Sequence, residues 1–204
     1  DLKKKGVTEA DCGGDATGYA LTVKKHYATE AQKLKDKMKE DFGEKKSEKK
    51  SKKQQFVYSF NLIDIKTRMY IGCGTSFKSE KEAFHNASTM IQKTGVKINS
   101  LRLDKYYSNK GDVTLCQELF GKVKMYLIPK SNATVGGFEW NKMLARLIEN
   151  VKAYLKEYYQ RNQSEGGFSE DKRRMGQRLG QKREDRIDTA NFLTTLWHNI
   201  YWLG

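Results

Sequence analysis

Apolar and polar residues alternate along several short runs of the chain, which is the pattern expected of β-strands. Two of these runs are separated only by the turn-like sequence Lys66-Thr67-Arg68, so they should form an antiparallel hairpin. The strands that this pattern predicts are 15–23, Phe56–Ile65, Met69–Thr75, Ile98–Leu103 and Val123–Ile128.

Apolar residues at three- and four-residue steps predict helices between and after these strands. The first should begin at a Ser79 cap, with Glu82 three positions later, and end at Gly95. Further helices are expected over 111–121, from Phe138 through Tyr158, and over Phe192–Leu203, the last packing back on the sheet. This order predicts an α/β fold with a mixed sheet, because a hairpin precedes strand–helix–strand crossovers.

The amino-acid composition indicates which class of molecule the protein binds. Lys and Arg number 39 against 25 Asp and Glu, which gives a net charge of +14 over 204 residues. Such an excess indicates a polyanion, either nucleic acid or an anionic membrane surface. No apolar run approaches the roughly 20 residues that span a bilayer, so nucleic acid is favoured and no membrane is expected. Three scattered cysteines indicate free thiols in a reduced intracellular setting, and no histidine has partners at zinc-ligand spacing.

A lysine-rich insertion at about residues 28–54 interrupts the single domain predicted over 1–204. Residues 33–53 alone contain ten lysines, five acids and few apolar side chains. We expect this stretch to be exposed and poorly ordered without DNA, since it has little apolar area to offset the entropy of ordering. The domain becomes helical from about residue 138. Because the chain begins with Asp1 rather than Met, an amino-terminal DNA-binding region is expected to be absent from it.

Two aspartates stand where a strand would deliver a carboxylate to an active site. Asp15 begins the first predicted strand, and Asp104 follows Ile98–Leu103. Rigid strand ends suit the several carboxylates that a hard ion such as Mg²⁺ needs. Each also has an ordinary interpretation: Asp15 as a turn residue equivalent to Asp11, and Asp104 as a cap. Asp64 is interpreted as a surface acid of the hairpin turn.

The sharpest pattern lies in the carboxy-terminal half. Four residues would share one face of a continuous helix, all within about 40° of Glu165: Tyr158, Arg161, Glu165 and Lys172. A carboxylate between two cations suits a metal ligand flanked by groups that hold phosphates. The simpler alternative is a surface ion pair between Arg161 and Glu165. The glycines at 166–167 argue against an uninterrupted helix, so that Tyr158 would precede its start.

This spacing resembles the Tyr-Arg-Glu-Lys signature of DDE-type transposases of prokaryotic insertion sequences. The resemblance covers nearly the whole chain in the right order. DATG at 15–18 is similar to the first-strand aspartate motif, KKQQFVYSFNLIDIKTRMYIG to the second and third strands, and LRLDKYYSN to the strand with the second aspartate. MYLIPKSNA is similar to the following strand and its lysine loop, and LWHNIYWL to the closing helix.

The resemblance implies an RNase H-like fold of the retroviral-integrase superfamily, with a mixed sheet flanked by helices. It also implies that Asp15, Asp104 and Glu165 are the catalytic residues and the ligands of two Mg²⁺ or Mn²⁺ ions. The side chains expected to contact DNA are Tyr158, Arg161, Lys172, Lys105, Lys130 and Arg173. The expected partners are transposon ends and target DNA, with a homodimer in the DNA complex and a cytoplasmic, nucleoid-associated location.

Three functions are compatible with these observations. In a transposase core, metal-activated water cuts one strand and the 3′-hydroxyl then attacks target DNA in line. An RNase H-like nuclease would cut without joining. A decayed or otherwise non-catalytic nucleic-acid-binding protein would need the basic charge and not the acids. Two departures from the family pattern, the glycines at 166–167 and the lysine-dense stretch, bear on where the helix starts and on whether this copy is active.

Overall fold

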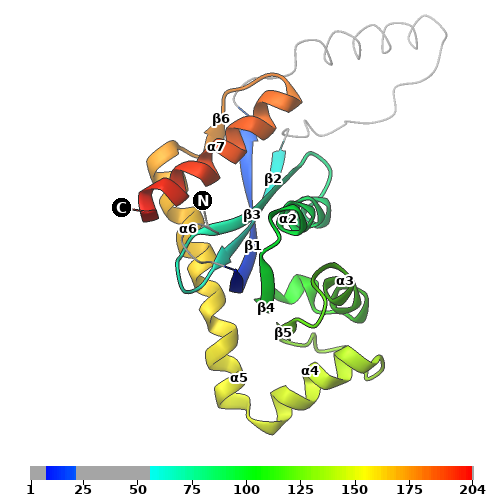
Figure 1. Ribbon diagram of the computed structural model, residues 1–204. Helices are drawn as coiled ribbons and strands as arrows, with labels where there is room; N and C mark the ends of the chain where they lie inside the picture. Colours follow the sequence, from blue (N-terminus) through cyan, green and yellow to red (C-terminus); the bar gives the residue numbers. More distant parts are fainter. Residues whose placement is uncertain (1–7, 22–55, 204) are drawn as a thin grey trace, which may run out of the picture.

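The computed structural model describes residues 8–21 and 56–203, in which a mixed sheet carries helices on both faces (Figure 1). The strands follow the order β3-β2-β1-β4-β5, and β6 pairs with the far end of β1. β2 lies between β1 and β3 and is antiparallel to both, whereas β4 and β6 run parallel to β1, and β5 runs parallel to β4. The bounds are β1 Glu9–Leu21, β2 Phe56–Asp64, β3 Tyr70–Ser76, β4 Lys97–Arg102, β5 Lys124–Tyr126 and β6 Arg178–Leu179. The predicted α/β class with a mixed sheet is confirmed, and the strand order is compatible with an RNase H-like fold.

β1 is longer than its sequence predicts. The strand expected at 15–23 starts at Glu9, so Asp15 lies in the middle of a strand and not at its beginning. Gly13 and Gly14 disfavour a strand when they are considered alone. Both are nevertheless paired, because β1 is central and has β2 on one side and β4 on the other. The pairing of the sheet outweighs local propensity here.

The β2–β3 hairpin is confirmed to within one residue at each strand boundary. Asp64, at the turn, is not the surface acid that was expected, since it is 3% exposed. Its Oδ2 accepts hydrogen bonds from the backbone N–H of Thr67 at 2.9 Å and from the Thr67 hydroxyl at 2.7 Å. The turn folds over this carboxylate and buries it, so Asp64 serves the turn itself.

Helix α2 (Glu80–Thr94) begins and ends where its caps predict. The Ser79 hydroxyl accepts from the N–H of Glu82 at 3.2 Å, and Gly95 takes a left-handed conformation with φ of 68°. The helix packs against β3 at backbone distance: a Cβ on Gly74 would lie 2.1 Å from the Ala83 carbonyl oxygen and 2.4 Å from the Ala87 nitrogen. Such close packing requires glycine at position 74.

We expect Gly74→Ala to lower the free energy of unfolding by about 2–3 kcal/mol, because the added methyl meets helix backbone that cannot turn aside. Gly166→Ala is the matched control: a Cβ there meets nothing within 4 Å. Since alanine is the better helix former, the control should gain about 0.5–1 kcal/mol. Urea denaturation of both proteins measures this difference, and a Gly74→Ala protein as stable as wild type would contradict the close packing.

β4 delivers Asp104 just beyond its end. Asp104 caps the short 3₁₀ helix η2 (Lys105–Tyr107) and accepts from the N–H of Lys105 at 2.6 Å, so the strand-end and cap interpretations both apply. Helix α3 (Lys110–Phe120) ends at Gly121, as predicted. The strand predicted at 123–128 is wrong at both ends, since β5 keeps only the three residues that pair with β4.

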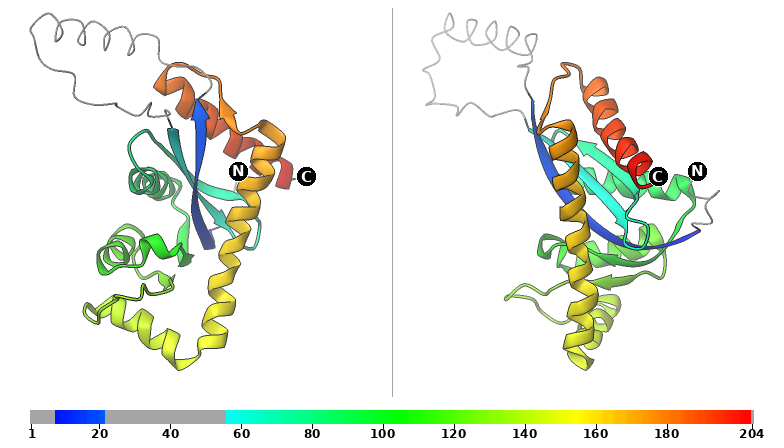
Figure 2. Two further views of the ribbon diagram at one scale, coloured as in Figure 1. Left: turned by 180° about the vertical axis from the view of Figure 1, so that it is seen from behind. Right: turned by 90° about the vertical axis from the view of Figure 1, so that its left-hand side faces the viewer.

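The carboxy-terminal helices α4 (Phe138–Glu149), α5 (Val151–Tyr158) and α6 (Asn162–Met175) occupy the region where helices were predicted. Asn150 separates α4 from α5, and its side chain caps α5 by accepting from the N–H of Ala153 at 3.0 Å. The 3₁₀ turn η3 (Tyr159–Arg161) keeps right-handed helical dihedrals. α5, η3 and α6 therefore form one nearly continuous helical rod (Figure 2).

Helix α7 (Glu184–Leu203) packs beside β3 on the face opposite α2 (Figure 1). The helix expected at 192–203 therefore starts earlier than predicted. Its first turn is polar and contains Glu184 and Asp185, which suits the amino terminus of a helix. A prediction based on the spacing of apolar residues does not detect such a turn. In the part of the chain that the structure describes, no helix is long and apolar enough to cross a membrane.

Two sets of buried apolar side chains hold these layers together. The larger lies between the sheet and α2, α3, α4 and α5 and includes Phe60, Phe84, Leu101, Tyr107 and Met143. The smaller consists of Tyr19, Val57, Leu179 and Ile187. All three cysteines are buried and free, as expected. The lysine-rich insertion predicted at about 28–54 lies outside the described residues, and the single-domain assignment stays a prediction.

Candidate active site

Asp15 and Asp104 come from equivalent positions on neighbouring parallel strands. Gly13 of β1 is in register with Arg102 of β4, and each aspartate follows two residues further along its own chain. Adjacent strands lie about 4.8 Å apart. Asp15, within β1, and Asp104, just beyond the end of β4, therefore lie at neighbouring positions of the sheet.

Gly13 allows the helical rod to cross directly over β1. A Cβ at this position would lie 2.8 Å from Ser164 Oγ and 3.5 Å from Arg161 Cα. Side chains two residues apart on a strand share a face, so Asp15 points toward the same rod. The absence of a side chain at Gly13 thus lets Arg161 and the start of α6 approach the carboxylate of Asp15.

Arg102 fastens the rod to β4 beside Asp104. This guanidinium is 3% exposed; its Nε donates to the Glu157 carbonyl oxygen at 2.7 Å, and it pairs with the Glu157 carboxylate. Its Nη1 also donates to Ser100 Oγ at 2.7 Å. The end of α5, and with it the Tyr158–Glu165 segment, is thereby held against the strand that leads to Asp104.

Arg161 bridges two of the three candidate carboxylates. Its Nη1 lies 3.6 Å from Asp15 Oδ2 and its Nη2 lies 2.7 Å from Glu165 Oε1. The guanidinium carbon is 6.0 Å from the ring centroid of Tyr158. The ion pair between Arg161 and Glu165 that the spacing allows is therefore present. It is more than a surface pair, because the Arg161 side chain is only 14% exposed and also reaches the sheet.

The surroundings of Asp15 disfavour its charged form. Burial raises the pKa of Asp15 to about 6; Arg161 opposes that shift, and Glu165 and Asp104 add to it. Burial and two neighbouring acids disfavour the ionised form of this carboxyl group. A cation that enters the site would stabilise that ionised form. Asp104 and Glu165 are therefore near enough to Asp15 to contribute to the rise in its pKa.

The three acids do not form a preformed metal site. In residues 8–21 and 56–203, no three His, Cys, Asp or Glu side chains are close enough to hold a metal ion. Arg161 compensates Asp15 and Glu165 instead. Three carboxylates are the oxygen donors that Mg²⁺ and Mn²⁺ prefer, so the chemistry of the donors is suitable. The assignment of Asp15, Asp104 and Glu165 as metal ligands stays a prediction.

Lys172 lies further along the same strand face. Its Nζ donates to Thr17 Oγ1 at 2.5 Å and lies 5.4 Å from the ring centroid of Tyr19, and burial lowers the pKa of Lys172. The side chains at positions 15, 17 and 19 lie on the same face of β1, because every second residue of a strand points to the same side. Thr17 and Tyr19 were not predicted as site residues, although their alternate positions after Asp15 in the sequence place them on its face of the strand. Asp15, Thr17 and Tyr19 thus run beneath the rod that carries Arg161, Glu165 and Lys172.

The other predicted DNA contacts are more dispersed. Lys105 follows Asp104 and is exposed, and Lys130 lies nearby, with its Nζ 3.3 Å from the Tyr106 carbonyl oxygen. Arg173 is exposed on α6. Tyr158, in contrast, is 5% exposed, and it contacts the site through Arg161. The structure therefore brings Lys105 and Lys130 to the Asp104 edge and leaves Arg173 at the end of the rod.

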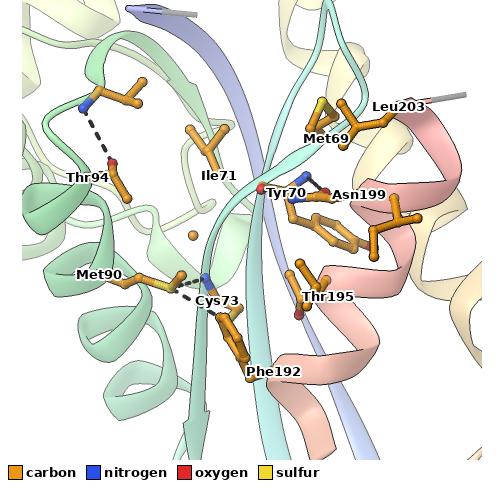
Figure 3. Close-up of a pocket in the computed structure, with 14 residues that line it drawn as sticks. Met69, Tyr70, Ile71, Cys73, Met90, Thr94, Phe192, Thr195, Asn199 and Leu203 are labelled. Carbon is orange, nitrogen blue, oxygen red and sulfur yellow. Dashed lines mark hydrogen bonds between the residues drawn. The ribbon is translucent and has the colours of Figure 1, made fainter. Parts of the chain in front are cut away.

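A separate apolar groove of about 480 Å³ lies between α2, β3 and α7 (Figure 3). Its walls include Met69, Ile71, Met90, Phe192 and Leu203. No carboxylate and no lysine or arginine lines it among the described residues. It therefore has none of the groups that phosphodiester chemistry needs.

Comparison with known proteins gives one informative match. No protein-family profile matches the sequence, and no solved structure is significantly similar. The chain is 42% identical, over 200 residues, to the probable transposase for insertion sequence element ISA1214 of Archaeoglobus fulgidus. The match covers 98% of this chain and 55% of that protein, so the chain spans about half the length of this curated relative.

Proposed function

We propose that this chain is the catalytic core of a DDE-type transposase of an insertion sequence, with an RNase H-like fold. It would cut DNA at the ends of the element and join the freed 3′-end to target DNA, acting as a homodimer in the DNA complex. The 42% identity to a probable insertion-sequence transposase supports the general function. The arrangement of the acids supports the chemistry.

One structural observation carries the proposal. Asp15 within β1 and Asp104 just beyond β4 lie at equivalent positions of neighbouring parallel strands, and Arg161 of the helical rod links Glu165 to Asp15. Paired strands and a fixed helix are rigid supports, as a site that positions reacting oxygens requires. Asp15, Asp104 and Glu165 would hold the two Mg²⁺ or Mn²⁺ ions, which when bound activate the attacking oxygen and stabilise the leaving oxygen of an in-line displacement.

The cations of the rod act on the DNA backbone. Arg161 already lies between two carboxylates and can turn its planar guanidinium toward a phosphate that enters the site. Lys172 is held on Thr17 further along β1, so that it would bind a second phosphate of the same strand. Together they would fix the strand along β1 while the acids face the bond to be cut.

The proposal is tested with DNA that carries the inverted repeats flanking the gene. Purified protein is incubated with end oligonucleotides and plasmid target in Mg²⁺, in Mn²⁺ and in EDTA. We expect strand cleavage and a joined product with either metal ion and neither product in EDTA, because EDTA removes the ions that activate the attacking oxygen. Asp104→Asn should remove both products while the protein keeps its DNA affinity and fold.

The other outcomes contradict the proposal in different ways. Cleavage without a joined product indicates a nuclease. DNA binding without chemistry in either metal ion indicates a non-catalytic binding protein. Cleavage that persists in EDTA would remove the metal-dependent mechanism altogether.

A further inference from the structure

A polar cleft opens near Asp104, between the start of α3 and the loop after β5. Its volume is about 480 Å³. Its polar lining consists of Ser108, Asn109, Lys110, Lys130, Asn132 and Thr134. Among the described residues it has no carboxylate in its lining. The buried Trp140 contributes an apolar wall, fixed by its Nε1, which donates to the Thr134 carbonyl oxygen at 3.0 Å.

Tyr106 adjoins this cleft through Lys130. Its side chain comes two residues after Asp104, is 46% exposed, and stands edge-on against the ring of Tyr107 at 5.3 Å. The Nζ of Lys130 donates to the Tyr106 carbonyl oxygen and lies 5.9 Å from the ring centroid. An aromatic ring that is fixed from one side, exposed, and accompanied by cations is the kind of platform on which nucleic-acid bases stack.

The charges around Tyr106 favour an anion. The Nζ of Lys81 lies 5.7 Å from the Tyr106 ring and pairs with Asp112 at 3.1 Å, so the acid that α3 contributes is already neutralised. Lys110 is held by the Val135 carbonyl oxygen at 2.9 Å. In the described part of the chain, no ion pair occupies Lys110 or Lys130. Both can therefore bind a phosphate.

We propose that Tyr106 and this cleft bind one unpaired nucleotide of the DNA strand that passes Asp104. Its base stacks on the exposed ring of Tyr106, and its phosphate is held by Lys130 and Lys110. The buried Ser108 hydroxyl, which has no hydrogen-bond partner among the described residues, offers one more donor. An unpaired nucleotide fits better than a duplex, because the face of a base is accessible only when it leaves the helical stack.

The inference takes DNA as the ligand from the proposed function, but its test needs no cleavage. Two DNA molecules are compared in EDTA: a blunt duplex, and the same duplex with a short overhang that contains 2-aminopurine. We expect the protein to quench the fluorescence of the overhang and to prefer the overhang DNA. Tyr106→Leu should weaken overhang binding about ten-fold or more, because the base no longer has a ring to stack on, and should leave blunt-duplex binding unchanged.

Matched variants separate stacking from charge. Tyr106→Phe should bind and quench like wild type, since it keeps the ring. Tyr201→Leu, at a tyrosine on α7 that is 59% exposed, should have no effect. Lys130→Ala should lower the slope of log affinity against log salt by about 0.7 for the overhang, whereas Lys93→Ala at the end of α2 should not. Equal weakening by Tyr106→Leu for both DNAs, or no quenching by the wild-type protein, would overturn the inference.

The two proposals fail separately. A protein that binds the overhang through Tyr106 but makes no cleaved product in Mg²⁺ or Mn²⁺ refutes the transposase proposal and leaves the nucleotide site intact. A protein that cuts and joins DNA while Tyr106→Leu binds the overhang normally refutes the nucleotide site alone.

Discussion

Glu165→Gln should reduce DNA cleavage by about a thousand-fold or more while DNA affinity persists or rises. The amide keeps the shape of the side chain but removes the negative charge that a metal ion needs, and it removes no contact with DNA. Glu170→Gln is the matched control: Glu170 lies on the same helix and forms an i,i+4 ion pair with Arg174 at 3.7 Å. Cleavage by the control should stay near the wild-type rate. If Glu165→Gln cuts as fast as wild type, Glu165 is not a metal ligand.

Arg161→Ala and Lys172→Ala should instead weaken DNA binding. Each is expected to lower the slope of log affinity against log salt by about one for every phosphate that the variant no longer binds. Cleavage by Lys172→Ala should recover in part at high protein concentration. Arg161→Ala should recover less, because it also leaves the carboxylates of Asp15 and Glu165 without their shared cation. If Arg161 and Glu165 formed only a surface ion pair, then Glu165→Gln, Arg161→Ala and Lys172→Ala would each change DNA binding and DNA cleavage very little.

The parts of the fold that depend on neighbouring residues could be predicted from the sequence. The caps at Ser79 and Gly95 and the β2–β3 hairpin are encoded within a few positions, and they are where they were expected. The early start of β1 was not predictable in this way. Gly13 and Gly14 disfavour strands, and only pairing with distant β2 and β4 makes them one.

In the candidate site, too, local sequence patterns predicted some features, whereas others depend on tertiary packing. Asp15 and Asp104 were proposed because they lie at predicted strand ends, although Asp15 lies within β1, and Arg161 and Glu165 were proposed from their helical spacing. No local pattern shows that Arg161 would reach across to Asp15, because that contact depends on how closely the rod packs on Gly13. The prediction that Asp64 is exposed was wrong for a related reason. The burial of this residue depends on the tertiary position of the turn, which a polar residue in a turn sequence does not indicate.

A buried set of hydrogen bonds, also unforeseen, holds α6 against β3 and α7. Asp171 and His198 are each 2% exposed, and their Oδ1 and Nδ1 atoms lie 2.8 Å apart. The Tyr70 hydroxyl donates to Asp171 Oδ2 at 2.8 Å. His198 Nε2 lies 2.9 Å from the Arg68 carbonyl oxygen, which can only accept, so Nε2 donates. Asn199 adds two hydrogen bonds to the backbone of Tyr70, at 2.7 Å each (Figure 3).

Asp171→Ala should lower the free energy of unfolding by about 3–5 kcal/mol, because it leaves the buried imidazole of His198 and the hydroxyl of Tyr70 without their shared acceptor. Asp171→Asn should cost only about 1 kcal/mol. Its amide N–H can donate to Nδ1 of a neutral imidazole, and its oxygen can accept from Tyr70, so every hydrogen bond is kept. Urea denaturation of both proteins, with Glu170→Ala as the partly exposed control, measures the difference.

The same comparison tests whether this contact positions the candidate site. Asp171 lies on the helix that carries Glu165 and Lys172, on its buried side. If the contact sets the height of α6 over β1, Asp171→Ala should reduce cleavage activity by more than its folded fraction explains, and Asp171→Asn should restore that activity with the fold. Equal stability of the alanine and asparagine variants would show that packing, and not hydrogen bonding to residue 171, holds α6 in place.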